Sequence, residues 1–179
     1  MKLLTILLLP LALLYNCKEL PDAKQHHSVE KQVATSQIPA VTQITFGVYC
    51  GECYKNCATM YRYTTGDKSF AADYTDAFFN RDGKPIPFGT SLKDAAYVAI
   101  GDDIIAHIPK LLLDSEKDTD NFGCPDCTDG CGIYFEMVIN GATKYFYIDS
   151  QTEQLTGEIK TFAGYLKLRI AEIKNKAGR

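Results

Sequence analysis

Two short cysteine clusters constrain this chain more than any other feature of its sequence. Residues 50–57, CGECYKNC, and residues 124–131, CPDCTDGC, share the spacing C-x2-C-x3-C. The chain has seven cysteines, and six of them lie in these clusters. Sulfur atoms so closely spaced can hold a metal ion, exchange electrons or form disulfide bonds, and the compartment of the protein decides between these uses.

Metal and haem chemistry explain the spacing poorly. Bacterial ferredoxins use C-x2-C-x2-C-x3-C-P, and neither cluster supplies the fourth cysteine or the proline. Haem attachment needs C-x-x-C-H, but Tyr54 and Thr128 occupy the histidine positions. The two C-x2-C pairs have suitable spacing for a zinc tetrahedron, yet Cys57 and Cys131 would then stay outside it. Zinc binding is kept as an alternative.

A thiol–disulfide redox centre at Cys124 and Cys127 is the other alternative. A C-x-x-C pair can exchange disulfides, because the pairing lowers the pKa of one thiol. The setting of a thioredoxin is absent, however, since the chain has no tryptophan and no βαβ pattern flanks the pair.

The N-terminus predicts export. Lys2 precedes an apolar run over residues 3–14, which is too short to span a bilayer and is typical of a secretory signal peptide. The sequence Leu14-Tyr15-Asn16-Cys17 resembles the lipobox of bacterial lipoproteins, which is cut before a cysteine that is then lipidated. Tyr15 and Asn16 depart from the small residues of the common box, so a simple secreted form or an uncleaved anchor stays open.

The lipobox resemblance implies a signal peptide over residues 1–16, lipid on Cys17 and attachment to a membrane through that lipid. Lys18 stands where aspartate would signal inner-membrane retention, so the resemblance implies an outer-membrane protein, periplasmic or surface-facing. The acidic start Lys18-Glu19-Leu20 also resembles the surface-export signals of Bacteroidota lipoproteins. Residues 17–40 hold the cysteine and a polar, proline-containing stretch that predicts a flexible tether. Residues 41–179 predict a single domain.

Export favours disulfides. With Cys17 assigned to lipid, an even number of cysteines remains in an oxidising compartment, which indicates a disulfide framework. Six cysteines allow fifteen pairings, and the sequence does not choose among them. The predicted disulfide residues are Cys50, Cys53, Cys57, Cys124, Cys127 and Cys131.

The local patterns predict an α+β domain, with an antiparallel sheet and helices on one face. Residues 42–50 predict a strand, residues 64–67 the turn of a hairpin, and Asn140-Gly141 a type I′ hairpin. Ser91 with Asp94 forms a capping box that predicts the start of a helix. A long C-terminal helix is predicted by apolar residues at helical spacing: Leu155, Ile159, Phe162, Leu166, Ile170 and Ile173.

The two halves follow the same order of cysteine cluster, strand, turn, strand and helix. This order is consistent with two pseudo-repeated strand–strand–helix units. Identity between the halves outside the cysteines is slight, so convergence is the alternative.

Charge and composition limit the partners. The net charge of −3 gives no basic footprint for nucleic acid, and we expect no cofactor. Residues 114–129 are acidic and favour a solvated loop, with calcium as the best metal if one binds. The candidate calcium ligands are Asp114, Glu116, Asp118 and Asp120. His107, the one histidine after residue 40, indicates a structural role.

Aromatic residues dominate the predicted hairpins. Because side chains alternate along a strand, consecutive aromatics must lie on both faces of the sheet. CPDCTDGCGIYFEM resembles uncharacterised exported domains of Bacteroidota, a resemblance that implies no activity. We therefore expect a non-catalytic binding or envelope-interaction module, with an unknown envelope or extracellular partner, that uses this aromatic face or the acidic loop. The aromatics are Tyr61, Tyr63, Tyr134, Phe135, Tyr145, Phe146 and Tyr147.

Overall fold

The computed structural model describes residues 40–80, 84–125, 127 and 130–179. The predicted signal peptide, Cys17 and residues 18–39 of the predicted tether lie outside this part of the chain. Within it, no helix combines the length and the apolar character needed to cross a bilayer.

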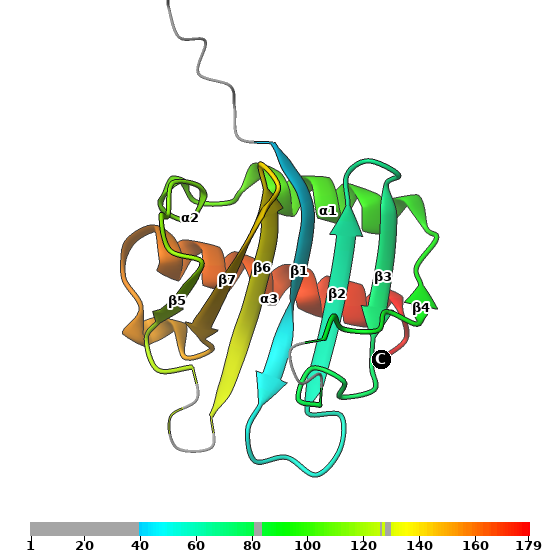
Figure 1. Ribbon diagram of the computed structural model, residues 1–179. Helices are drawn as coiled ribbons and strands as arrows, with labels where there is room; N and C mark the ends of the chain where they lie inside the picture. Colours follow the sequence, from blue (N-terminus) through cyan, green and yellow to red (C-terminus); the bar gives the residue numbers. More distant parts are fainter. Residues whose placement is uncertain (1–39, 81–83, 126, 128–129) are drawn as a thin grey trace, which may run out of the picture. The chain divides into compact units, whose positions relative to one another are not determined.

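The described residues form a seven-stranded sheet with the strand order β4-β3-β2-β1-β6-β7-β5 (Figure 1). The predicted α+β class is confirmed. The expectation of an antiparallel sheet needs one correction, because β5 pairs with β7 in parallel. β5 reaches the edge through α1 and α2, and such a crossover allows a parallel strand. The strands are β1 (Val41–Cys50), β2 (Ala58–Thr64), β3 (Ser69–Asp73), β4 (Thr90–Ser91), β5 (Thr119–Phe122), β6 (Cys131–Ile139) and β7 (Ala142–Asp149).

The helices α1 (Ala95–Ala106) and α3 (Gly157–Lys176) cover one face of the sheet (Figure 1). A short helix, α2 (Lys110–Leu113), and a 3-10 turn, η2 (Thr152–Gln154), lie in the connections. The predicted stripe of α3 is confirmed, since all its members are buried. Leu155 belongs to the stripe but precedes the helix.

The predicted capping box at the start of α1 is wrong in its first residue. Ser91 belongs to β4 and pairs with Ala71. Asp94 caps the helix instead, because its carboxylate accepts a hydrogen bond of 2.8 Å from the Ala96 N–H. Pro109 follows the end of α1 and precedes α2. A proline favours such a break because it has no N–H to donate to the preceding turn of a helix.

Both predicted hairpins are confirmed. β2 and β3 are joined across residues 65–68, and β6 and β7 across Asn140 and Gly141. Asn140 and Gly141 have φ angles of 51° and 81°, the positive values that a type I′ turn requires. The two hairpins flank β1 on either side, and the pseudo-repeat stays a prediction.

Gly101 allows a close approach between α1 and the sheet. A Cβ atom at this position of α1 would lie 2.4 Å from the Tyr63 ring of β2. Gly101 and Tyr63 are both buried in the layer between α1 and the sheet. The glycine therefore sets how closely the helix packs on the strands.

Candidate functional site: a groove on the open face of the sheet

The two faces of the sheet have different surroundings. Along each strand, every second side chain packs with α1 and α3 in the main core. The side chains between them lie on the face away from the helices, which we call the open face. The alternation predicted for the aromatics is confirmed: Tyr61, Tyr63, Phe135 and Phe146 face the helices, and Tyr134, Tyr145 and Tyr147 lie on the open face.

The end of the open face nearest the cysteines is covered. Tyr49, Met60 and Tyr134 pack there with Phe78 and Ile86 from the segment between β3 and β4. Phe78 lies 5.0 Å from Tyr49 and 5.0 Å from Tyr134 between ring centroids. This aromatic cluster anchors Phe78 and Ile86 on the sheet.

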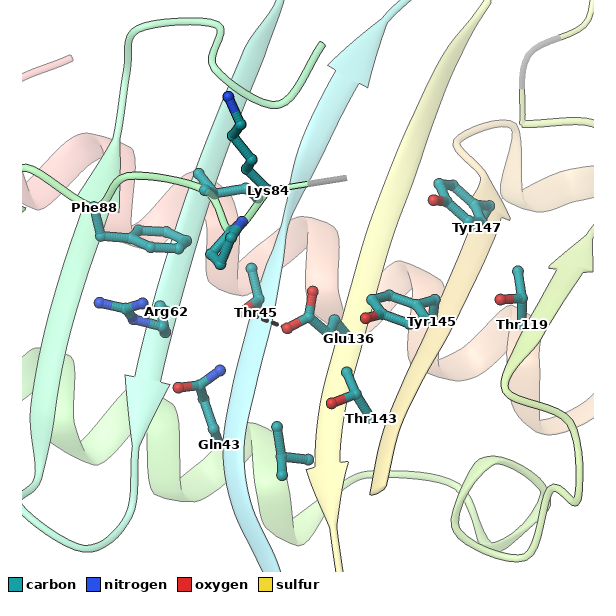
Figure 2. A pocket seen from close by; sticks show the side chains of 13 residues that line it. Gln43, Thr45, Arg62, Lys84, Phe88, Thr119, Glu136, Thr143, Tyr145 and Tyr147 are labelled. Atoms are coloured by element: carbon teal, nitrogen blue, oxygen red, sulfur yellow. Dashed lines mark hydrogen bonds between the residues drawn. The ribbon is translucent and has the colours of Figure 1, made fainter. Parts of the chain in front are cut away.

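The remaining part of the open face forms a groove of about 500 Å³, which we call the sheet groove (Figure 2). Its size is within the usual range for small-ligand sites. The floor comes from five strands of the sheet, and one wall comes from residues 84–88. The lining residues are Gln43, Thr45, Arg62, Lys84, Pro85, Ile86, Phe88, Thr119, Glu136, Val138, Thr143, Tyr145 and Tyr147.

One cross-strand row provides most of the polar floor. The strand register places Arg62 opposite Thr45, Thr45 opposite Glu136, and Glu136 opposite Tyr145. Neighbouring strands lie about 4.8 Å apart, so the row extends about 14 Å from Arg62 to Tyr145. Figure 2 shows Arg62 and Phe88 at one side, Glu136 in the middle and Tyr145 at the other side.

Arg62 is the main cation of the groove. Its guanidinium carbon lies 4.4 Å from the centre of the Phe88 ring, a cation–π contact that orients the charged group. No carboxylate of the described residues forms an ion pair with it. The five N–H donors of the guanidinium therefore have capacity for an anion.

Glu136 is held from two sides. The Tyr134 hydroxyl donates a 2.5 Å hydrogen bond to Oε2, and the Thr45 hydroxyl donates a weaker one of 3.4 Å to Oε1. A carboxylate has about four acceptor positions, so two donors leave room for ligand hydroxyls. Glu136 is thus a fixed acceptor in the middle of the row.

The charge of the groove has the opposite sign to that of the chain. Arg62 and Lys84 provide two cations, and Glu136 provides one carboxylate. The whole chain carries −3. A local excess of positive charge on an acidic protein favours an anionic group in the ligand.

The six cluster cysteines form three disulfides, as predicted. Cys50 pairs with Cys131, Cys53 with Cys57, and Cys124 with Cys127. Cys50 and Cys131 stand directly opposite each other on β1 and β6, 81 residues apart in sequence. This bond joins the central strands, and the protein is a disulfide-stabilised module. These disulfides also use the cysteine sulfurs that zinc binding would require as thiolates.

A second groove, of about 820 Å³, lies next to the Cys124–Cys127 disulfide. Both cysteines are exposed, and Pro125 and Tyr147 lie with them along the lining. The Cys124 N–H donates a 3.1 Å hydrogen bond to the buried Asp149 carboxylate, which fixes the start of the loop.

The predicted calcium ligands do not come together. Asp114 forms an ion pair with Lys110, and Asp120 forms one of 3.0 Å with Lys117. Glu116 and Asp118 are exposed. Within the described ranges, no three His, Cys, Asp or Glu side chains gather closely enough to hold a metal ion.

His107 belongs to a polar cluster between α1 and α3, away from the sheet groove. Its ring stacks on Tyr165 at 4.5 Å, and its Nδ1 lies 3.3 Å from the Asp103 carboxylate. The Tyr165 hydroxyl donates to Asp103, and Arg169 forms a 2.6 Å ion pair with it. The Tyr165 hydrogen bond, then Arg169 and His107, lower the pKa of Asp103.

Sequence reasoning missed the charged residues of the sheet groove, although a signal for them exists. Arg62 stands between Tyr61 and Tyr63, and Glu136 stands between Phe135 and Met137. A charged residue between two apolar ones in a strand faces away from the core. The strand register that unites these side chains is not readable from one sequence.

Comparison with known proteins gives no match: no protein-family model, no curated protein and no solved structure matches the chain.

Proposed function

We propose that the protein is a non-catalytic binding module whose sheet groove takes a ligand with an anionic group. The observation that carries this proposal is Arg62, which is oriented by Phe88 on the floor of the groove and paired with no carboxylate of the described residues. A guanidinium of this kind binds carboxylate or phosphate through two parallel hydrogen bonds. Lys84 on the groove wall adds a second positive charge.

The rigidity of the groove supports a binding role. Its floor belongs to strands tied together by the Cys50–Cys131 disulfide. Its wall is anchored by the packing of Ile86 on the sheet. A preformed site loses little conformational freedom when it binds, so more of the interaction energy appears as affinity.

A titration followed by nuclear magnetic resonance tests this function. The oxidised protein is titrated with acetate, inorganic phosphate and glucuronate, and with glucose as the neutral counterpart of glucuronate. We expect the anions to shift the amide resonances of Thr45, Arg62 and Glu136, and the neutral sugar to shift them much less. An absence of anion-dependent shifts in the groove would overturn the proposal.

We further propose that the module is exported and held on the outer membrane by a lipid on Cys17. The lipobox-like residues 14–17 support the anchor, and the three disulfides favour an oxidising compartment. Metabolic labelling of a bacterial host with an alkyne fatty acid tests the anchor. Wild type should take up the label and Cys17→Ser should not, whereas equal labelling of both would refute it.

Thiol–disulfide exchange at Cys124 and Cys127 is the second candidate function. The favouring observation is the exposure of both cysteines beside a groove of about 820 Å³. In such a step a substrate thiolate attacks one sulfur of the bond, the other leaves as thiolate, and a second substrate thiol completes a disulfide in the substrate. This exchange oxidises one substrate dithiol and reduces the Cys124–Cys127 disulfide to two thiols. A redox role predicts that mild glutathione buffer frees two thiols per chain, whereas resistance to it excludes this role.

A further inference from the structure

We infer that the anionic ligand of the sheet groove is an acidic oligosaccharide, a short chain of sugar rings that carries uronic acid carboxylates. This inference rests on the proposed function and names the chemical class of its ligand. Three properties of the groove lead to it: the kind of groups that line it, their spacing, and the position of the two charge signs.

The neutral lining of the groove matches a ligand rich in hydroxyls. Hydroxyl and amide side chains both donate and accept hydrogen bonds, and they pair readily with sugar hydroxyls, which do the same. Six lining residues carry such groups on the strands: Gln43, Thr45, Thr119, Thr143, Tyr145 and Tyr147.

The apolar lining is poorly suited to a peptide. Peptide recognition relies on pockets that bury apolar or aromatic anchor residues. Ile86 is only 5% exposed because it packs against the sheet, and the Phe88 ring is in contact with the Arg62 guanidinium. Pro85 and Val138 complete the apolar lining at the wall and on the floor. Apart from the Tyr145 and Tyr147 rings, little apolar surface thus remains for anchor side chains.

The spacing calls for more than one sugar ring. Arg62 and Tyr145 are three strands apart along the row, or about 14 Å between their backbones. A single small acid cannot contact both ends of this row, whereas a chain of two or three linked rings can. The half-buried Tyr145 can take the apolar C–H side of a sugar ring on its aromatic face, and its hydroxyl can meet the ring substituents.

The order of charges along the row gives the orientation of the ligand. The carboxylate of one sugar lies at Arg62 and Lys84, because Glu136 repels it from the middle of the groove. Hydroxyls of the next ring donate to Glu136, whose oxygens Tyr134 and Thr45 already hold in place. A neutral sugar chain would leave Arg62 without its anion.

Isothermal titration calorimetry with trigalacturonate tests the inference. The probes are trigalacturonate, its methyl ester, which is neutral, and the acidic tripeptide acetyl-Asp-Ser-Asp-amide. We expect trigalacturonate to bind at least tenfold more tightly than its ester and than the peptide. Arg62→Gln should weaken trigalacturonate binding by about ten- to a hundredfold, the usual effect of losing hydrogen bonds to a charged partner.

Two further variants keep the test decisive if Arg62→Gln folds poorly. Lys84→Gln changes an exposed residue and should weaken trigalacturonate binding several-fold while leaving the ester unaffected. Lys160→Gln removes the same charge from the exposed surface of α3 and should change neither affinity. Circular dichroism of each variant checks the fold.

The outcomes separate this inference from the proposed function. Tighter binding of the acidic peptide, or equal binding of trigalacturonate and its ester, overturns the oligosaccharide while leaving an anion site at Arg62 intact. If trigalacturonate does not bind while glucuronate still shifts the groove resonances, the oligosaccharide is likewise overturned and the anion site stays intact. If no anion binds, or if the affinity for trigalacturonate is unchanged in both Arg62→Gln and Lys84→Gln, the proposed function is overturned together with the inference.

Discussion

Arg62 and Glu136 lie in one cross-strand row of the open face, with Thr45 as the residue between them. The two opposite charges therefore stand about 10 Å apart at the backbone, on rigid strands. Tyr134 holds Glu136, and Phe88 holds Arg62. Each charge is kept in place by a neighbour and is available to a ligand that reaches both.

The hydrogen bond from Tyr134 to Glu136 should be measurable in stability. Tyr134→Phe keeps the ring in the aromatic cluster but removes a 2.5 Å bond to a charged acceptor. We expect a loss of about 1.5–3 kcal/mol in the free energy of unfolding, determined by urea denaturation. Tyr54→Phe, at a position 93% exposed, is the control and should change it by less than about 0.5 kcal/mol.

The Cys50–Cys131 disulfide should contribute more stability than the Cys124–Cys127 disulfide. The first joins cysteines 81 residues apart in sequence, and the second joins cysteines 3 residues apart. A disulfide restricts the unfolded chain more when the loop that it closes is longer. Replacing both cysteines by alanine should cost about 4.5 kcal/mol for the first pair and about 2 kcal/mol for the second. Urea denaturation of the two double variants compares them, and equal losses would contradict this order.

Gly101 and Gly164 should respond in opposite ways to alanine. Both lie within helices, but a Cβ at Gly101 would collide with the Tyr63 ring at 2.4 Å, whereas Gly164 has nothing within 4 Å. Gly101→Ala should destabilise the domain by about 1–3 kcal/mol through overpacking. Gly164→Ala should stabilise it by up to about 1 kcal/mol, because alanine favours the helix. Thermal unfolding of both variants provides the test.

The contribution of Asp103 to stability should depend on pH. Tyr165, Arg169 and His107 lower the pKa of its carboxyl in the folded protein below the unfolded value. The contribution is therefore complete above about pH 4 and is lost as the pH falls through the folded pKa. Wild type should exceed Asp103→Asn in unfolding free energy at pH 5. The difference should shrink between pH 5 and pH 2, and a difference that grows over this range would refute this origin.

The sequence predicted those parts of the fold that local patterns determine. Asn140-Gly141 requires positive φ angles, and the apolar stripe from Ile159 to Ile173 requires one buried helix face, so both elements followed from neighbouring residues. The even number of cysteines in the two clusters likewise predicted disulfides. The pairing of Cys50 with Cys131 did not follow, because it depends on β1 lying beside β6, and these two strands are far apart along the chain.

The sheet groove escaped prediction for the same reason. Arg62, Thr45 and Glu136 come from three strands, and only the strand register unites them. The parallel position of β5 and the start of α1 at Ala95 also depend on tertiary packing. Gly101 weakens the helical pattern in the sequence, and its contact with Tyr63 explains why a glycine stands there.

The most direct test of the binding account is the observation of nuclear Overhauser effects between trigalacturonate and the oxidised protein. The account predicts effects from the sugar ring protons to the Tyr145 ring and to the Thr45 and Thr143 methyl groups of the sheet groove. Effects confined to the second groove around Phe79 and Pro125, or none with ligand in saturating excess, would contradict it.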